Sequence, residues 1–415
     1  MTYLENYKLL KEKFDIAKKE TNIENLNLQI RNLQFESFKA NILPGEDEYY
    51  CNEHNYTFKK SFDFLNIKKS ENIDKLLKEK DSKIKENIKF NYSIFEHKKY
   101  NSKKESKSNG CIILFHGFNE KDWSKYLPWA KRLAESTEKK IILFPIAFHM
   151  NRAPQNWSDP KRMIKVNKER KKLFPNLSNS SFANAAISTR LQHLPQRFLW
   201  SGLQSYYDII QLVNEIRTGV HPIIRKDESI DFFSYSIGSF LSLLLIMANP
   251  YNYFSKTKLF NFCGGPTLNR ISAASKYILD SEANISVYSF FIEHLDNELR
   301  KDKRLAHYFS KLHPIGKYFK CMLDFHKMKN FREKRLSELN KKIFSIALRK
   351  DKIIPPAEVY NTLKGSSRNT HTKLKILDFK YKYDHVVPFP NSTKFEKKVD
   401  KAFNKVFKYA TKHLK

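Results

Sequence analysis

The sequence of 415 residues predicts an α/β fold with a mainly parallel sheet and helices on both of its faces. From residue 88 onward, short and almost entirely apolar runs recur along the chain, and segments with helical spacing separate several of them. A strand that is apolar on both sides belongs in a parallel sheet covered by helices on both faces. Hydrophobic residues make up 41% of the chain, which is enough to build a sizeable core.

The individual elements follow from these patterns. Strands are predicted over residues 88–97, 111–118, 139–148, 229–236, 258–265, 342–351 and 373–385. Helices are predicted over 202–217 and from Phe395 to Ala410, because apolar residues recur there every three or four positions. The polar run at 100–110 is expected to be a solvated turn.

The same reading divides the chain into four parts. Residues 1–86 are polar and charged, and we expect them to form a mostly helical extension. Residues 87–265 and 342–415 are expected to supply the first and last parts of the α/β core. Residues 266–341 are expected to form a helical cap insertion, whose aromatic residues either build a core of their own or line an apolar pocket.

The four cysteines and the amino-terminal segment indicate in which cellular compartment the protein is expected and whether it is expected to bind a cofactor. Cys51, Cys111, Cys263 and Cys321 are scattered without a CxxC pair, so neither a disulfide framework nor a metal site is predicted, and no cofactor is expected. The first residues lack the apolar stretch and cleavage site of a signal peptide, and no apolar run is long enough to span a membrane. A cytoplasmic protein is therefore expected.

The formal net charge of +32 leaves two interpretations open. It could mark contact with nucleic acid or a membrane surface. We favour the lysine-rich background of a whole proteome, because the lysines are spread along the chain and no recognisable nucleic-acid motif accompanies them. No specific nucleic-acid partner is expected, and nothing in the sequence indicates an oligomeric state.

The most informative short motif is Ser234-x-Ser236-x-Gly238, where an apolar strand runs into an apolar helix. A serine on such a sharp turn has its Oγ held out of the sheet, and the N–H of Ile237 points to where an oxyanion would form. The glycine allows strand and helix to approach closely. Alone this motif is weak evidence, because small residues recur often enough to produce it by chance.

Other residues that could act together with Ser236 lie at the ends of other predicted strands. In His116-Gly117-Phe118, the N–H of Phe118 is expected to be the second oxyanion donor, and His116 is expected to brace the loop rather than act as a base. Asp351 and His385 follow at the carboxyl ends of two later strands.

We expect His385 to act as general base and Asp351 to orient it. Asp384 is a rival acid, disfavoured because adjacent side chains on an extended segment point apart. Loops after the strand ends are expected to edge a substrate pocket, with Asn119, Arg152 and Trp157 as candidates. An ordinary structured loop is the alternative at Arg152 and Trp157.

Together these motifs resemble those of the α/β-hydrolase superfamily, and more narrowly those of uncharacterised bacterial α/β-hydrolase-like proteins. The resemblance extends from Ile88 to the carboxyl terminus, and it departs from the superfamily pattern at Ser234, where glycine is usual. A serine nucleophile argues against the dehalogenase and epoxide-hydrolase branches, which carry aspartate.

The resemblance implies a serine hydrolase that cleaves a carboxylic ester, thioester or amide of a small-molecule acyl substrate through an acyl-enzyme. The alternatives are an acyltransferase with the same three residues, or a non-catalytic binding protein that uses its basic surface.

Overall fold

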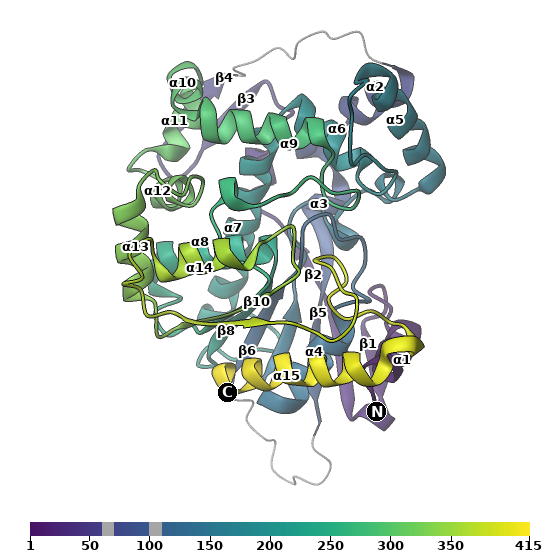
Figure 1. The fold of residues 1–415 in the computed structure, drawn as a ribbon. Helices are drawn as coiled ribbons and strands as arrows, with labels where there is room; N and C mark the ends of the chain where they lie inside the picture. Colours follow the sequence, from purple (N-terminus) through teal and green to yellow (C-terminus); the bar gives the residue numbers. More distant parts are fainter. Residues whose placement is uncertain (60–69, 99–109) are drawn as a thin grey trace.

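A nine-stranded mixed sheet forms the centre of the computed structural model, which describes residues 1–59, 70–98 and 110–415 (Figure 1). In chain order its strands are β1 (Glu20–Ile23), β2 (Leu28–Glu36), β5 (Lys89–His97), β6 (Cys111–Phe115), β7 (Lys140–Leu143), β8 (Ile230–Tyr235), β9 (Leu259–Phe262), β10 (Ile343–Leu348) and β11 (Lys373–Leu377). In space they follow the order β1-β2-β5-β7-β6-β8-β9-β10-β11. Pairing is antiparallel from β1 to β7 and parallel from β7 to β11. The predicted α/β fold with a mainly parallel sheet is confirmed.

The central strands are apolar on both sides because both sides are buried. In β6, Cys111, Ile113 and Phe115 contribute to one hydrophobic core, whereas Ile112 and Leu114 contribute to the other. All residues of β8 and β10 are buried as well. Continuous apolar runs of this kind are what a sheet with two covered faces requires.

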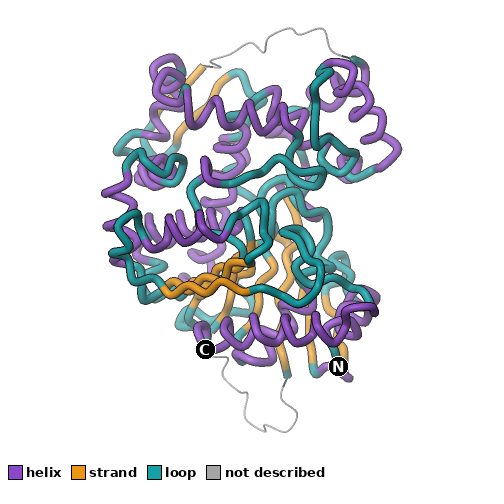
Figure 2. Tube along the Cα trace, in the orientation of Figure 1, coloured by secondary structure: helices purple, strands orange, loops and turns teal. Residues whose placement is uncertain are grey.

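Helices cover both faces of the sheet (Figures 1 and 2). One face carries α1 (Tyr3–Lys13), α4 (Leu127–Thr137) and α15 (Glu396–Leu414), which pack against one another and against the strands. The other face carries α7 (Arg197–Thr218), α8 (Ile237–Ala248) and α14 (Pro356–Lys364). In the described residues, none of the helices is long and apolar enough to cross a bilayer.

The amino-terminal part differs from the mostly helical extension expected for residues 1–86. Strands β1 and β2 extend the main sheet, and β3 (Glu48–Cys51) pairs with β4 (Tyr56–Lys59) in a separate hairpin. Helices α2 (Glu71–Lys78) and α3 (Lys85–Ile88) follow. Along β2, buried residues alternate with more exposed ones, which is the pattern of a strand. Charged residues at the exposed positions hide this pattern when the segment is judged by its composition alone.

Above the carboxyl ends of the strands lies a layer of helices drawn from two insertions (Figure 1). Between β7 and β8 the chain forms α5 (Pro160–Leu173) and α6 (Ala185–His193). Between β9 and β10 it forms α9 (Ser281–Tyr288), α10 (Leu295–Lys301), α11 (Lys303–Phe309), α12 (Pro314–Cys321), α13 (Lys329–Glu338) and a π-helical turn at Ser289–Glu293. Helix α6 packs on α9, so both insertions contribute to the cap.

Short 3₁₀ turns complete the described chain. They cover Glu24–Leu26, Ala40–Ile42, Asp81–Lys83, Met150–Arg152, Gln155–Trp157, Pro250–Asn252, Leu268–Arg270 and Thr393–Phe395. The expected solvated turn at 100–110 lies outside the described residues except for its last residue.

The last strand is shorter than predicted. Strand β11 ends at Leu377, whereas the alternating pattern continues to His385. Phe379, Tyr381 and Tyr383 are buried in an aromatic cluster, and the described residues offer them no strand to pair with beyond the sheet edge. Alternating burial therefore arises here from side-chain packing without a ladder of backbone hydrogen bonds.

Candidate active site

Ser236 occupies the turn between β8 and α8, in a backbone conformation that few residues other than glycine adopt. Its φ is 56° and its ψ is −123°. A Cβ on Gly238 would lie 2.7 Å from Phe115 Cβ and 2.8 Å from the Phe115 carbonyl oxygen. Glycine is therefore required where the first turn of α8 crosses β6. Ser234 fits its place because its buried hydroxyl donates to Ser242 Oγ at 2.8 Å.

Three side chains from separate segments form a continuous hydrogen-bond chain at this turn. Ser236 Oγ lies 2.7 Å from His385 Nε2, and His385 Nδ1 lies 2.7 Å from Asp351 Oδ2. The other carboxylate oxygen, Asp351 Oδ1, accepts the backbone N–H groups of Ile353 and Ile354, each at 2.9 Å. Since the carboxylate only accepts, His385 carries a proton on Nδ1 and presents the lone pair of Nε2 to the serine.

The rival acid lies elsewhere. Asp384 is exposed, and its Oδ1 accepts the backbone N–H of Val387 at 2.7 Å. Asp351, in contrast, is only 4% exposed. The structure thus brings Asp351, and not the sequence neighbour of His385, to the imidazole.

Two further groups surround this chain of hydrogen bonds. The Tyr235 hydroxyl donates to the carbonyl oxygen of His385, and its ring stacks on the imidazole with centroids 5.5 Å apart. Cys263 is completely buried beside Asp351, and burial together with that carboxylate raises the pKa of the thiol well above its usual value. The thiol is therefore a neutral donor beside the acid, not a competing nucleophile.

The loop after β6 is held by a network that the sequence reasoning predicted only at His116. His116 Nε2 accepts the N–H of Ile146 at 3.0 Å, so Nδ1 carries the proton and donates to the Gly117 carbonyl at 2.8 Å. Burial, with His149 nearby, lowers the pKa of His116 well below its usual value. A neutral imidazole thus bridges two loops, which is a bracing arrangement.

The same loop is anchored by two residues that the sequence reasoning missed. The Tyr126 hydroxyl accepts the Gly117 N–H at 2.8 Å and donates to Glu120 at 3.0 Å. Lys125 pairs with Glu120 and donates to the Val386 carbonyl at 3.1 Å, so it ties this loop to the one that carries His385. Neither residue belongs to a motif, and their positions become evident only from the folded loops.

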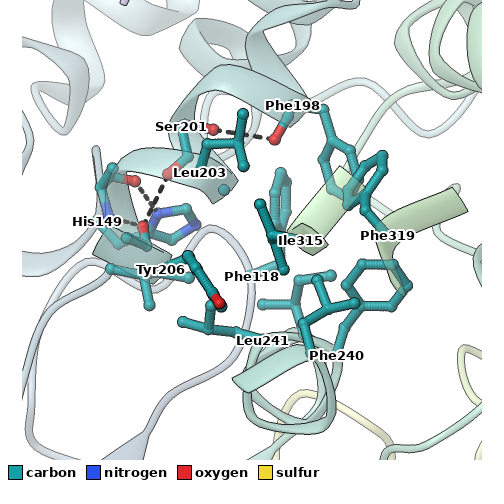
Figure 3. A pocket seen from close by; sticks show the side chains of 16 residues that line it. Phe118, His149, Phe198, Ser201, Leu203, Tyr206, Phe240, Leu241, Ile315 and Phe319 are labelled. Carbon is teal, nitrogen blue, oxygen red and sulfur yellow. Dashed lines mark hydrogen bonds between the residues drawn. The ribbon is translucent and has the colours of Figure 1, made fainter. Parts of the chain in front are cut away.

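Two apolar cavities meet beside the serine, at Ile237. One is lined by Ile237 and by side chains of α7, α8 and α12, among them Phe198, Phe240 and Phe319 (Figure 3). The second is lined by Ser236 itself and by residues of the cap. Phe118, Phe198 and Ile237 line both cavities.

Of the aromatic residues in the predicted cap insertion, Tyr288 and Phe319 line these two cavities. Phe291, by comparison, packs against Phe290 in the helical layer. His149 projects into the first cavity with its Nδ1 near the Ala147 carbonyl, and burial lowers its pKa to about 3 (Figure 3). The imidazole is therefore neutral, in keeping with the apolar lining.

A third, more polar cavity opens on the other side of Ser236 and His385 and is lined by Asn119 and Glu120. Asn119 Nδ2 donates to the carbonyls of Ala183 and Tyr277, which ties the loop after β6 to the cap. Its Oδ1 is buried and has no hydrogen-bond partner among the described residues. Asn119 thus lines the same cavity as Ser236 and His385, and its role in binding a substrate stays a prediction.

The other two predicted pocket residues differ from expectation. Arg152 is completely buried, pairs with Asp208 on α7 and donates to the Asn87 and Pro145 carbonyls, so it braces the loop beneath the cap and does not edge the pocket. Trp157 donates its indole N–H to Glu79 at 3.0 Å and lines a smaller side cavity away from the serine. Sequence alone could not place Arg152, because its partner lies on a distant helix.

Solved structures with a similar arrangement include esterases and an α/β-hydrolase. A cold-adapted esterase from an Arctic intertidal metagenomic library has 10% identity and a TM-score of 0.38, with 97% of this chain and 100% of that chain covered. A thermostable esterase from Pseudomonas putida has 9% identity and a TM-score of 0.41, with 100% and 91% covered. A peroxisomal α/β-hydrolase from Saccharomyces cerevisiae has 12% identity and a TM-score of 0.36, with 78% and 81% covered.

At the level of sequence, the chain matches one protein family. No curated protein matches the chain. One family model, described as a family of unknown function (DUF6051), matches residues 1–415. The chain therefore belongs to the DUF6051 family.

Proposed function

We propose that this protein is a serine hydrolase that cleaves a carboxylic ester through an acyl-enzyme on Ser236. The observation that carries the proposal is the hydrogen-bond chain from Ser236 through His385 to Asp351, with contacts of 2.7 Å at both steps, beside an apolar cavity. A structural role for these groups alone would not explain a serine held at a φ of 56° with its hydroxyl facing an imidazole.

The proposed reaction begins with proton transfer. His385 Nε2 takes the proton from Ser236 Oγ as the oxygen attacks the carbonyl carbon of the ester. The Asp351 carboxylate stabilises the imidazolium and holds Nδ1–H in place. The negative charge that develops on the carbonyl oxygen is stabilised by the N–H groups of Ile237 and Phe118, the first of which has no partner within helix α8.

Collapse of the tetrahedral intermediate completes the first half. The bond to the leaving alkoxide breaks, His385 Nε2 returns its proton to that oxygen, and the acyl group stays on Ser236. Water, deprotonated by the same nitrogen, then attacks the acyl carbon. The bond from that carbon to Ser236 Oγ breaks, His385 Nε2 returns the proton to Oγ, and the carboxylic acid leaves. The apolar cavities suit the acyl chain, and the polar cavity beside Asn119 suits the departing alcohol.

Labelling with a fluorophosphonate probe tests the proposal. The purified chain is expected to be modified at a single serine, and Ser236→Ala is expected to abolish the modification while the protein stays folded. Ser234→Ala is the matched control: it lies two residues earlier, in strand β8, its hydroxyl faces Ser242, and it is expected to keep the label. Lack of labelling in the native protein, together with no hydrolysis of p-nitrophenyl esters, would exclude the proposed function.

The same measurement separates the two alternative functions. An acyltransferase with these residues would label equally, but would give an acylated acceptor when an alcohol or amine competes with water. A non-catalytic binding protein would not label at all.

A further inference from the structure

One cysteine and three histidines converge where the β3–β4 hairpin meets the cap. Cys51 ends β3, His54 lies in the hairpin turn, His307 is on α11, and His313 immediately precedes α12. Cys51 Sγ lies 3.5 Å from both His54 Nδ1 and His313 Nε2. His313 Nε2 lies 3.1 Å from His307 Nε2, and all four atoms lie within 4.8 Å of one another.

We propose that these four residues bind one Zn²⁺ ion in a tetrahedral Cys₁His₃ site. With zinc–nitrogen bonds of about 2.0 Å and a zinc–sulfur bond of about 2.3 Å, a tetrahedron has edges of about 3.3 Å between nitrogens and about 3.5 Å from sulfur to nitrogen. Three of the six separations among the four atoms, at 3.1, 3.5 and 3.5 Å, lie close to these edges, and the others stay within 4.8 Å, so metal binding would need only a small inward shift of the remaining side chains. One thiolate with three imidazoles is a ligand set that favours zinc over the hard cations, which bind oxygen.

Hydrogen bonding alone accounts for the cluster less well. His313 Nε2 faces both Cys51 Sγ and His307 Nε2, but an imidazole nitrogen has only one proton or one lone pair, directed in the plane of the ring. It cannot serve both contacts with well-directed hydrogen bonds. A metal ion at the centre of the four atoms would use one lone pair from each and leave none of the contacts unexplained.

Surrounding groups orient the imidazoles in the manner of a metal site. The Tyr207 hydroxyl on α7 lies 3.0 Å from His313 Nδ1, which leaves Nε2 directed at the cluster. Tyr308 stacks on the His313 ring with centroids 4.4 Å apart. The rings of Tyr56 and Phe58 lie 4.9 and 5.0 Å from that of His307, so aromatic side chains flank the ligands.

Four protein ligands would close the coordination sphere, which makes the site structural rather than catalytic. It would join the amino-terminal hairpin to the cap, two segments separated by 262 positions in the chain but adjacent at one end of the molecule (Figure 1). Helix α12, which His313 precedes, carries Ile315 and Phe319, both of which line the apolar cavity near the serine. Metal binding would therefore fix one wall of that cavity.

Close packing holds α11 and α12 in the position that the cluster needs. A Cβ on Gly316 would lie 2.2 Å from the Tyr308 carbonyl oxygen, so the two helices approach where only glycine fits. This contact brings His307 and His313, on either side of the bend, to the same point. No metal site is predicted from the sequence, because the cysteines form no CxxC pair and because Cys51-x-x-His54 and His307-x₅-His313 lie far apart in the chain.

Elemental analysis of the full-length protein, purified under reducing conditions without chelators, tests the proposal. We expect one zinc per chain, and a loss of at least tenfold in bound zinc for His307→Ala. His294→Ala is the matched control, because this exposed cap histidine lies outside the cluster and is expected to retain one zinc. Equal zinc content in wild type, His307→Ala and control would overturn the proposal.

A second measurement uses the wild-type chain and so does not depend on how variants fold. After removal of zinc with a chelator and titration with Co²⁺, we expect the intense visible bands of tetrahedral cobalt and a thiolate-to-cobalt charge-transfer band in the near ultraviolet. In Cys51→Ser the charge-transfer band should disappear. A wild-type protein that binds no zinc and shows neither cobalt feature would refute the site, whatever the outcome of the fluorophosphonate labelling.

Discussion

Replacement of Asp351 by asparagine tests the role of the acid most directly. Asp351 Oδ1 is held by two backbone N–H groups at 2.9 Å, so the carbonyl oxygen of the new amide would take that position. Its NH₂ group would then face His385 Nδ1, where the carboxylate oxygen now lies at 2.7 Å. Because two donors cannot face each other, the imidazole would move its proton to Nε2.

An imidazole in that tautomer donates to Ser236 and cannot accept its proton. The expected loss is about four orders of magnitude in turnover, the effect of presenting the wrong tautomer in a serine–histidine–aspartate system. Asparagine has nearly the same volume as aspartate, so the fold should survive. Asp384→Asn is the matched control, since the amide oxygen can still accept the Val387 N–H, and its activity should remain that of the wild type.

The assay is the rate at which a fluorophosphonate probe modifies each folded variant, with far-ultraviolet circular dichroism to verify folding. A larger loss for Asp384→Asn than for Asp351→Asn would show that the acid is assigned to the wrong residue. Equal and small losses in both would refute the tautomer argument itself.

Further changes probe packing, charge and pH. Gly238→Ala brings its Cβ within 2.7 to 2.9 Å of three atoms of the neighbouring strand end and loop, so urea unfolding should show a loss of about 1–3 kcal/mol and probe labelling should slow about 100-fold. Gly202→Ala meets no atom within 4 Å and should instead raise the unfolding free energy by about 0.5–1 kcal/mol; a loss would contradict the open space seen there. Asp208→Asn leaves the completely buried Arg152 without its counter-ion, so calorimetry should show a destabilisation of about 3–5 kcal/mol, and a change below about 1 kcal/mol would argue against a buried pair. Burial lowers the pKa of His149 from 6.5 to about 3, so below pH 6.5 the unfolded chain binds a proton that the folded chain does not. Stability attributable to His149 is thus complete above pH 6.5 and falls by about 2 kcal/mol at pH 5; His149→Leu should lose this part of the pH dependence, and an unchanged slope would refute it.

The parallel part of the sheet was predictable because its strands are buried on both faces and therefore appear as unbroken apolar runs. The positions of Ser236, Asp351 and His385 near the carboxyl ends of such strands were predictable for the same reason. Their contact follows from topology, since parallel strands place these ends at one edge. His385 itself lies eight residues beyond β11, in a segment held by aromatic packing instead of strand pairing.

The remaining features depend on contacts between distant segments. Along strand β2, buried residues alternate mostly with polar or charged ones, and only its pairing with β5 shows that it belongs to the sheet. Arg152 carries the same charge whether it faces a substrate or a buried Asp208, and only the position of α7 decides between them. The cysteine–histidine cluster likewise unites residues from the two ends of a long stretch of chain, so no local pattern indicates it.

Helix α1 has a consequence for the order in which the molecule folds. Thr2 Oγ1 donates to Glu396, and the Tyr3 N–H donates to Asp400, partners 394 and 397 positions away on α15. The Tyr3 ring also packs on Phe403 with centroids 4.8 Å apart. During synthesis the first helix leaves the ribosome long before this partner exists, so it can pack on α4 early, whereas the contacts of Thr2 and Tyr3 must wait for α15. Closure of the contact between the first and last helices is therefore a late step, and until α15 emerges the Tyr3 ring lacks its Phe403 partner.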